Sequence, residues 1–380
     1  MLGYSRFLAK SLHSKGLIAL HTHNQMGGTV SYDLSKYRRH GVLSAVTHRQ
    51  SGVPGLHIPS TGFDGATSYN NIYTAGFAND NLLLNPGFET AGAGGVDIWA
   101  NWEESVSDGA LANETTIIHE GVDAAKITAG TGRATFIYQD ITVVAGKKYR
   151  LRFWTRALGV RSVRYALYDN SNSADIVVLA ETLIIGTTYT AFVKEFTAPA
   201  GCTSVRLYLR CPNGATDVAY VDACEVRRMD GFLGDEGTLL AWAKVSAAGV
   251  WADGAARVIA ETFIDNDNYI WLYKFTDNVL YFTYKAGGVQ EQVGLAITPT
   301  TFFNMGITWS KSGDAVKAYY NGVQAGLTQT ALGTWAGNLS ATRCTIGARN
   351  VAAFWSGPIG PVPIFNEAKS PTEMKYLMSP

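Results

Sequence analysis

The chain has 380 residues, with 31 Lys and Arg against 31 Asp and Glu, so its formal net charge is zero. A balanced charge argues against a nucleic-acid-binding protein, which needs a basic excess, and no apolar run is long enough to span a bilayer. The length predicts two or three domains, while 40 glycines, 12% aromatic residues and only 16% charged residues favour an all-β protein.

The first 15 residues, MLGYSRFLAKSLHSK, are expected to form a separate N-terminal segment. A short amphipathic helix, an extra strand and a frayed terminus all fit its pattern. The segment lacks the continuous apolar stretch of a signal peptide. A protein of this kind that acts outside a cell would therefore leave it by another route, such as lysis.

Residues 16–80 contain strand-like stretches but too few of them to close a core alone. GLIALHTHNQMGGTVSYDLS and GLHIPSTGFDGATSY resemble the opening of a laminin-G or concanavalin-A-like lectin domain. The resemblance places Asp33 and Asp64 at positions near turns, where turn capping is as expected as metal binding. His21 and His23 share one face of a strand, but no third zinc ligand is evident, so a polar solvent face is expected.

Residues 81–228 show the alternation of a β-sandwich. In YRLRFWTR (149–156) the apolar side chains fall on one face and the arginines with Trp154 on the other. SVRLYLRC and VRYALYDN behave in the same way, and turn residues follow each stretch. NLLLNPGFE, YRLRFWTRA and VAYVDACEV together resemble a carbohydrate-binding-module jelly roll of the 4/9 type, over about 150 residues.

The jelly-roll resemblance implies a structural Ca²⁺ where the first and last strands meet. Glu89 of NPGFE and Asp222 of YVDA stand at the matching positions. Asp222 is also expected to point inward, in phase with Val218, Tyr220 and Cys224. A buried carboxylate needs a cation or other partners, so a hydrogen-bonded or ion-paired Asp222 without a metal is the alternative.

Aromatic and arginine side chains are predicted to form a glycan-binding face on the outside of this unit, because sugar CH groups stack on rings and hydroxyls need planar polar partners. The expected residues are Trp154, Tyr208, Tyr168, Arg152, Arg164, Arg206 and Arg210, with Trp99 and Trp102 of a neighbouring loop as a further platform. A protein neighbour covering the same face is the alternative interpretation.

Residues 229–380 resemble the remainder of the lectin domain. GTLLAWAKVS is similar to an early core strand, and KAYYNGVQAG to a hairpin whose turn is Asn321-Gly322. We therefore expect two β-sandwiches: a concanavalin-A/laminin-G-like one built from 16–80 plus 229–380, and a jelly roll, 81–228, inserted into one of its loops. Three consecutive units are the alternative.

Motifs for catalysis are missing from the sequence. Hydrolases with a concanavalin-like fold usually carry an E-x-D-x-x-E strand, and the nearest acidic cluster, Glu261, Asp265 and Asp267, has the wrong spacing. The chain is therefore predicted to have no enzymatic activity. The four cysteines show no metal or disulfide pattern, which favours free, mostly buried thiols.

These features favour a non-catalytic, glycan-binding bacteriophage virion protein: a tail, fibre or capsid-decorating component on the virion surface. Its expected partners are a host or environmental glycan, other virion proteins and further copies of itself. A purely architectural virion protein without glycan binding, and an accessory module or enzyme of polysaccharide degradation, are the alternatives.

Overall fold

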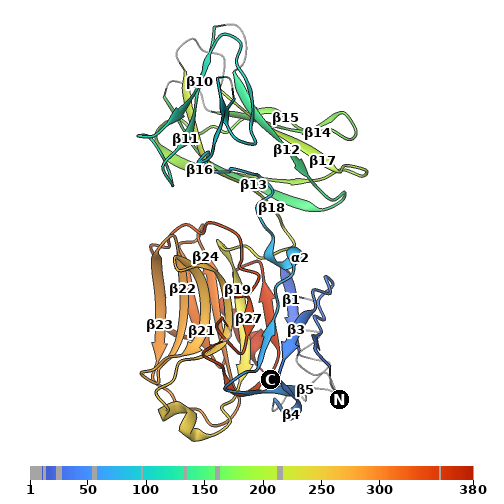
Figure 1. The fold of residues 1–380 in the computed structure, drawn as a ribbon. Helices are drawn as coiled ribbons and strands as arrows, with labels where there is room; N and C mark the ends of the chain where they lie inside the picture. Colours follow the sequence, from blue (N-terminus) through green and yellow to red (C-terminus); the bar gives the residue numbers. More distant parts are fainter. Residues whose placement is uncertain are drawn as a thin grey trace. The chain divides into compact units, whose positions relative to one another are not determined.

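The computed structural model describes residues 11, 14–22, 28–53, 58–95, 97–131, 135–158, 163–211, 217–350 and 352–379. Nearly all regular structure in these ranges is β-strand, which confirms the all-β prediction. The chain forms two compact units, one of Met1–Asp80 with Asp230–Pro380 and one of Asn81–Met229 (Figure 1). Most of the N-terminal segment and His23 lie outside the described residues. No helix within those residues is long and apolar enough to cross a membrane.

The discontinuous unit is a sandwich of two antiparallel sheets. In the described residues the first has nine strands: β26 (Val323–Gln329), β25 (Ala315–Tyr320), β24 (Phe303–Ser310), β19 (Glu236–Ala243), β28 (Ser356–Ile359), β5 (Ile58–Asp64) and β4 (Thr47–Val53) in order, with β29 (Val362–Phe365) joining β19 to β1 (Leu17–His21). The second has eight: β2 (Val30–Ser31), β3 (Gly41–Ser44), β6 (Tyr69–Asn71), β27 (Thr345–Ile346), β20 (Arg257–Asp265), β21 (Asn268–Lys274), β22 (Leu280–Ala286) and β23 (Val289–Leu295). Short helices α2 (Ala75–Ala78), η1 (Ala248–Ala252) and α3 (Pro371–Met378) complete it.

Strands from the two ends of the chain pair directly in this unit. β1 pairs with β29, β5 with β28 and β6 with β27, so the blue N-terminal strands of Figure 1 lie beside the orange and red C-terminal ones. The early strands cannot bury their apolar faces alone, because a few strands do not enclose a core. The pairing supplies the missing partners, and both sheets mix strands from before and after the inserted unit.

Alternation along β19 gives the nine-stranded sheet an apolar side chain on each face. Leu239, Ala241 and Ala243 enter the main core between the two sheets. Leu240 and Trp242 point to the opposite face, into a second apolar cluster. Helix α3 covers that cluster with Met374, Leu377 and Met378, and begins at a capping box formed by Ser370 and Glu373.

A two-residue turn joins β25 to β26. Asn321 and Gly322 have φ values of 49° and 81°, which a two-residue hairpin of type I′ requires. The hairpin predicted from the Asn-Gly pair is therefore confirmed. The turn brings Asn321 beside Asn304, whose backbone N–H donates to Asn321 Oδ1 at 3.0 Å.

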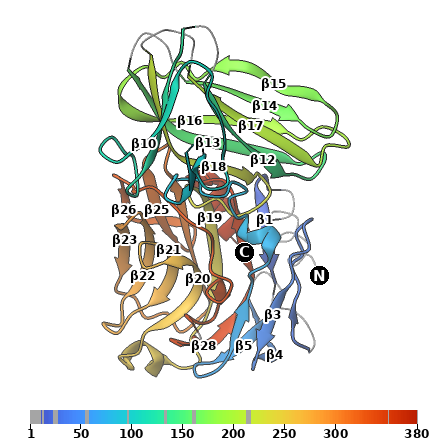
Figure 2. The same ribbon diagram turned by 45° about the horizontal axis from the view of Figure 1, so that its top comes forward.

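The inserted unit is a sandwich of two five-stranded antiparallel sheets within the described residues (Figure 2). One has the order β10 (Ala110–Glu114), β11 (Ala124–Thr128), β18 (Val218–Arg228), β13 (Lys148–Leu158) and β16 (Gly186–Thr197). The other has the order β15 (Ala174–Glu181), β14 (Arg164–Asp169), β17 (Ser204–Arg210), β12 (Phe136–Thr142) and β9 (Glu103–Ser105). A small hairpin, β7 (Ala91–Gly94) and β8 (Asp97–Trp99), lies near its start.

The core of the inserted unit follows the alternation in the sequence. Leu151 and Phe153 on β13 and Val205, Leu207 and Leu209 on β17 are fully buried, as expected from their spacing. All four cysteines of the chain are free and buried, and burial raises the pKa of Cys211 to about 12. Such thiols pack as small apolar groups.

The chain leaves and re-enters the discontinuous unit at adjacent points. On the inserted side, Asn81 donates from Nδ2 to the Cys224 carbonyl and accepts from the Val226 N–H, both at 2.9 Å. On the other side, the Phe232 N–H donates to the Phe77 carbonyl at 2.9 Å. In each unit, hydrogen bonds therefore join the segment where the chain enters to the segment where it leaves. One unit can then be inserted into the other while each keeps its own closed core.

Strand β18 contains a β-bulge at Ala223, whose φ is 48°. Before the bulge Ala219 and Val221 face the core, and after it Cys224 and Val226 do. Asp222 is therefore not in phase with Cys224, and the prediction that it points into the sandwich is wrong. It lies opposite Trp154 of β13, on the outer face of the sheet, where other residues of the unit cover it completely.

Candidate functional site

The residues predicted to form one glycan-binding face lie on two different faces. Trp154 and Arg152 are on β13, in one sheet of the inserted unit, whereas the other five are on β14 and β17, in the other sheet. The prediction of a single face is therefore wrong. Alternation separates inward from outward side chains, but a sandwich has two outer faces and periodicity does not say which one a strand supplies. Tyr168, Tyr208, Arg164, Arg206 and Arg210 do share a sheet.

The expected platform of Trp99 and Trp102 is also wrong. Their side chains are only 1% and 3% exposed and belong to the core, where both rings pack against Phe88. Each indole N–H has an internal partner, Asn113 Oδ1 for Trp99 and the Asn85 carbonyl for Trp102. These tryptophans stabilise the start of the inserted unit and cannot present a ring to a ligand.

An aromatic cluster lies on the outer face of the sheet β15-β14-β17-β12-β9, which we call the tyrosine face. Its side chains are Phe136, Tyr138 and Asp140 of β12, Arg164 and Tyr168 of β14, and Arg206, Tyr208 and Arg210 of β17. Tyr138 lies directly opposite Tyr208, with ring centroids 5.5 Å apart, and Phe136 contacts both rings. All three rings are half-buried, so each presents part of its surface to solvent.

An ion pair borders the rings at one end of the tyrosine face. The Arg206 guanidinium donates to both oxygens of Asp140, at 2.7 and 2.8 Å, and its central carbon lies 4.2 Å from the centroid of the Tyr138 ring. The hydrogen bonds from Arg206 hold the pKa of Asp140 below its ordinary value. The bidentate pair fixes the guanidinium plane over the ring, where it can meet a bound molecule without losing rotamer freedom.

Two further arginines lie at the other end of this face. Arg164 and Arg210 are cross-strand neighbours on β14 and β17, and both lie in register with Phe136 of β12. Burial, and then the charge of Arg164, lower the pKa of Arg210. Two adjacent cations beside an aromatic ring favour a ligand that carries oxygen acceptors or a negative charge.

On the outer face of the other sheet, which contains β13 and β18, charged side chains form ion pairs with one another. Arg150, Arg152 and Arg227 surround Glu225, with N···O distances of 3.1, 3.1 and 2.9 Å. Burial alone would raise the pKa of Glu225, but the three arginines lower it to about 2. Arg152 therefore binds an internal carboxylate, and the Trp154 ring stacks on His119 with centroids 3.9 Å apart.

The predicted calcium ligands bind backbone N–H groups. Asp222 Oδ2 accepts from His119 and Glu120 at 2.8 and 3.1 Å, and Oδ1 accepts from Ala223 at 2.7 Å. Both oxygens of Glu89 accept from the Val122 N–H, at 3.0 and 3.1 Å.

Calcium needs six to eight oxygens around one point, and N–H dipoles aimed at the same carboxylates oppose a cation. Among the described residues no group of three or more His, Cys, Asp or Glu side chains could hold a metal ion. The two carboxylates hold the loop 119–123 against the sheet. A calcium ion bound by Glu89 and Asp222 stays a prediction.

Asp33 and Asp64, the acidic residues that the lectin resemblance places near turns, both have structural partners. Asp33 accepts from the N–H groups of Leu20, Ser35 and Arg39, and Asp64 accepts from those of Ala66, Thr67 and Ser68. Both therefore cap turns.

Glu261 is the buried member of the acidic cluster considered for catalysis. Burial raises its pKa, and Arg343 opposes this through an ion pair of 2.6 Å. Asp265 instead caps a turn by accepting from the Asp267 N–H and from Asn268. Each of the two carboxylates therefore has structural partners of its own.

Two antiparallel β-sandwiches, one with a partly exposed aromatic and arginine face, make up the part of the chain that the structure describes. Sequence comparison finds one family for each of two stretches of the chain. Residues 80–216 match the family described as "Carbohydrate binding domain", and residues 217–375 match the family described as "Concanavalin A-like lectin/glucanases superfamily". No curated protein sequence matches the chain significantly.

Solved structures with some similarity include the sialidase module CBM40 of Ruminococcus gnavus bound to α2,3-sialyllactose, at 13% identity over 38% of this chain and 83% of that one, with a TM-score of 0.31. A xylan-binding domain of Paenibacillus barcinonensis Xyn10C matches at 13% identity over 40% and 97%, with a TM-score of 0.32. The active domain of tailspike protein 4 of bacteriophage CBA120 matches at 11% identity over 39% and 21%, with a TM-score of 0.32. These scores are too low to indicate what the chain binds.

The tyrosine face contains residues that sequence reasoning missed. Phe136, Tyr138 and Asp140 lie in the stretch FIYQDIT, which alternates as clearly as YRLRFWTR and SVRLYLRC do. Every second residue of this stretch points outward, and the first two of these residues are aromatic and the third is acidic. This pattern is the signal that could have identified them.

Proposed function

We propose that the chain is a non-catalytic glycan-binding protein and that the tyrosine face of the inserted unit binds the glycan. The observation that carries this proposal is the pair of half-exposed rings, Tyr138 and Tyr208, with the Arg206 guanidinium fixed beside them by Asp140. The match of residues 80–216 to a carbohydrate-binding family supports it.

The arrangement suits a sugar chain lying along strands β12 and β17. Apolar CH faces of successive sugar rings would stack on Tyr138, Tyr208 and Phe136. Arg206 and Asp140 at one end would hydrogen-bond hydroxyl groups, since together they offer donors and acceptors. Arg164 and Arg210 at the other end would favour a sugar carrying a carboxylate or a sulfate group.

The test is a glycan array with the wild-type chain, followed by calorimetry on the best ligand. Tyr138→Ala and Tyr208→Ala should each weaken binding at least about tenfold, which corresponds to about 1.4 kcal/mol. Both rings are partly exposed, so the fold should persist in each variant. Tyr32→Ala, which removes a 47% exposed tyrosine from the other unit, is the matched control and should bind normally. Unchanged affinity in both face variants would contradict the proposal.

The virion assignment, with self-association, virion partners and a location on the particle surface, stays a prediction. It rests on the resemblance of the sequence to two families of binding sandwiches, and on the sequence lacking the catalytic and export motifs that were sought in it. Mass spectrometry of purified particles from a phage that encodes the chain is the direct check.

A further inference from the structure

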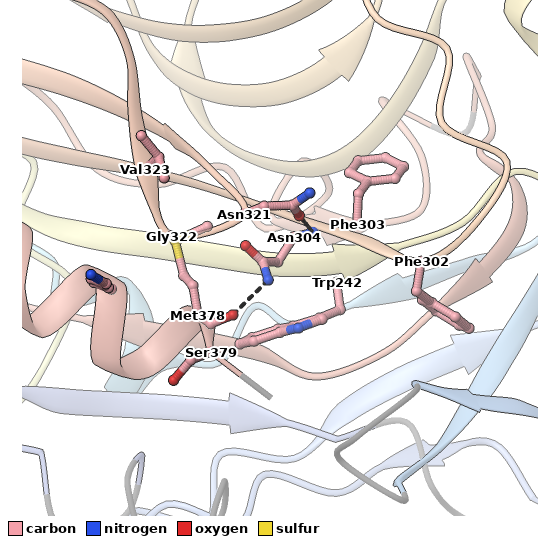
Figure 3. A pocket seen from close by; sticks show the side chains of 10 residues that line it. Trp242, Phe302, Phe303, Asn304, Asn321, Gly322, Val323, Met378 and Ser379 are labelled. Atoms are coloured by element: carbon pink, nitrogen blue, oxygen red, sulfur yellow. Dashed lines mark hydrogen bonds between the residues drawn. The ribbon is translucent and has the colours of Figure 1, made fainter.

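Strand β26 is a terminal strand of the nine-stranded sheet and pairs with β25 alone among the described residues. It begins at Val323, which together with Asn321 and Gly322 lines a pocket of about 400 Å³ beside helix α3 (Figure 3). β23, the terminal strand of the facing sheet, comes close, since a Cβ on Gly326 would lie 2.9 Å from Val293 Cγ1. No ladder between β23 and β26 is found in the part of the chain that the structure describes. One edge of β26 therefore has backbone N–H and C=O groups without a strand partner.

The side chains along this edge include two exposed aliphatic ones. Val323 is 67% exposed and Leu327 is 81% exposed, which is the highest value for a large apolar side chain in the described residues. Residues 326–328 lie opposite Lys317 alone, and this bulge pushes Leu327 out of the ladder with β25. A partner that covered the edge would therefore gain the free energy of burying apolar surface.

Charge distinguishes β26 from the other edges of the molecule. Natural sheets usually protect an exposed edge with charged side chains or proline, and β26, VQAGLTQ, contains neither. The other partly exposed terminal strands of five or more described residues each contain at least one charged residue: Arg49 on β4, Glu291 on β23, Glu114 on β10, Lys194 and Glu195 on β16, and Asp175 and Glu181 on β15.

This difference matters most when a strand meets a second copy of itself. If β15 paired antiparallel with its own copy about Val178, Asp175 of each copy would lie opposite Glu181 of the other, and like charges directly opposite are destabilising. β26 brings no charge to such a contact. A second copy of the chain is therefore the partner that its composition fits best.

The size of the edge limits how tightly it can hold that partner. Seven residues of strand are roughly 24 Å long, and two facing sheets with their side chains form a wall roughly 20 Å across. Such a wall would bury on the order of 500 Å² per copy, or about 1,000 Å² in total, which is at the low end of specific interfaces. This area fits a dimer that forms and dissociates with concentration.

We infer that β26 is a self-association surface, at which two copies of the chain meet edge to edge about a two-fold axis. An axis perpendicular to the sheet makes the two strands antiparallel, so the free N–H and C=O groups of each copy face those of the other. Val323 and Leu327 of both copies then lose their exposure to water. The contact belongs to the discontinuous unit, uses no residue of the tyrosine face, and does not depend on the proposed glycan binding.

Sedimentation velocity of the full chain is the test. With this area the dissociation constant should lie in the range of about 10 to 100 μM, so the concentration is varied from about 1 to 200 μM. The sedimentation coefficient should rise towards that of a dimer. A chain that stays monomeric up to about 200 μM overturns the inference, and so does growth beyond a dimer, because a two-fold contact closes on itself.

Two matched variants locate the contact. Leu327→Lys adds a charge to the edge at a position that packs on nothing, so it should fold normally and raise the dissociation constant at least about tenfold. Leu183→Lys makes the same change at an 80% exposed leucine of the inserted unit and should dimerise as the wild type does. Undiminished dimerisation of Leu327→Lys, or an equal loss in Leu183→Lys, contradicts the inference.

Hydrogen exchange shows whether the backbone edge takes part. Between low and high protein concentration, amides of Val323–Gln329 that point away from β25 should exchange at least about threefold more slowly, because they gain a partner. Amides of β15 should exchange at the same rate at both concentrations. A chain that dimerises without any slowing in β26 has its contact elsewhere, which overturns the inference.

Discussion

Asp222 shows how a single buried carboxylate makes stability depend on pH. Its side chain is fully buried, and burial raises its pKa from 3.8 to about 6, although three N–H bonds oppose the shift. Between pH 4 and 6 the folded chain retains a proton that the unfolded chain releases. The contribution of Asp222 to the free energy of unfolding should therefore fall as pH rises through this window, by at most about 3 kcal/mol.

Urea unfolding of the wild type and of Asp222→Asn at pH 4, 5, 6 and 7 checks this. The stability of the wild type relative to the variant should decline from pH 4 to 6 and then level off. A difference that is constant over the whole range would show that the N–H bonds from His119, Glu120 and Ala223 outweigh burial.

At the same scale, the sequence identified Asp222 and Glu89 but not what they do. A motif match says that a carboxylate stands at a position, whereas its partners depend on where distant residues arrive. The loop containing His119 and Glu120 is more than 100 residues from Asp222.

At the scale of elements, the bulge in β18 decides which side chains of that strand face the core of the inserted unit. Ala223 adopts a left-handed conformation, which costs a residue with a Cβ about 1 to 2 kcal/mol. Ala223→Gly should therefore raise the free energy of unfolding by up to about 1 kcal/mol, after the entropic penalty of glycine. Ala219→Gly, at a buried position on the same strand, should lower it by about 1 to 2 kcal/mol. Chemical denaturation measures both, and a loss of stability in Ala223→Gly would contradict this account.

The inward-facing residues of each strand were easier to predict than the sheet to which the strand belongs. The spacing of Leu151 and Phe153, or of Leu207 and Leu209, indicated inward faces that are buried in the structure. Which sheet each strand joins is decided by pairing between distant segments, such as β12 with β17, and local alternation carries no information about it. The bulge was missed for a similar reason, since Ala223 does not have the residue type that usually marks a left-handed position.

At the scale of the whole molecule, the hydrogen bonds of Phe232 with Phe77 and Asn79 hold the two passages of the chain together inside the discontinuous unit. Replacing residues 81–229 by a short Gly-Ser linker should therefore leave a folded sandwich that melts cooperatively, as measured by circular dichroism. Removing residues 16–80 instead should abolish folding of the remainder, because β27, β28 and β29 lose their partners. An unfolded product from the first deletion would contradict this expectation.

The pairing of β1 with β29 also governs how the chain responds to pulling. Leu17 and Phe365 are opposite each other in this pair, so tension applied between the chain before β1 and the chain after β29 should act first across their ladder. The inserted sandwich enters and leaves beside the Asn81 side chain, which holds its own ends together. It should bear no load until the surrounding sandwich has ruptured, so the tyrosine face is expected to be shielded from tension for as long as that rupture is delayed.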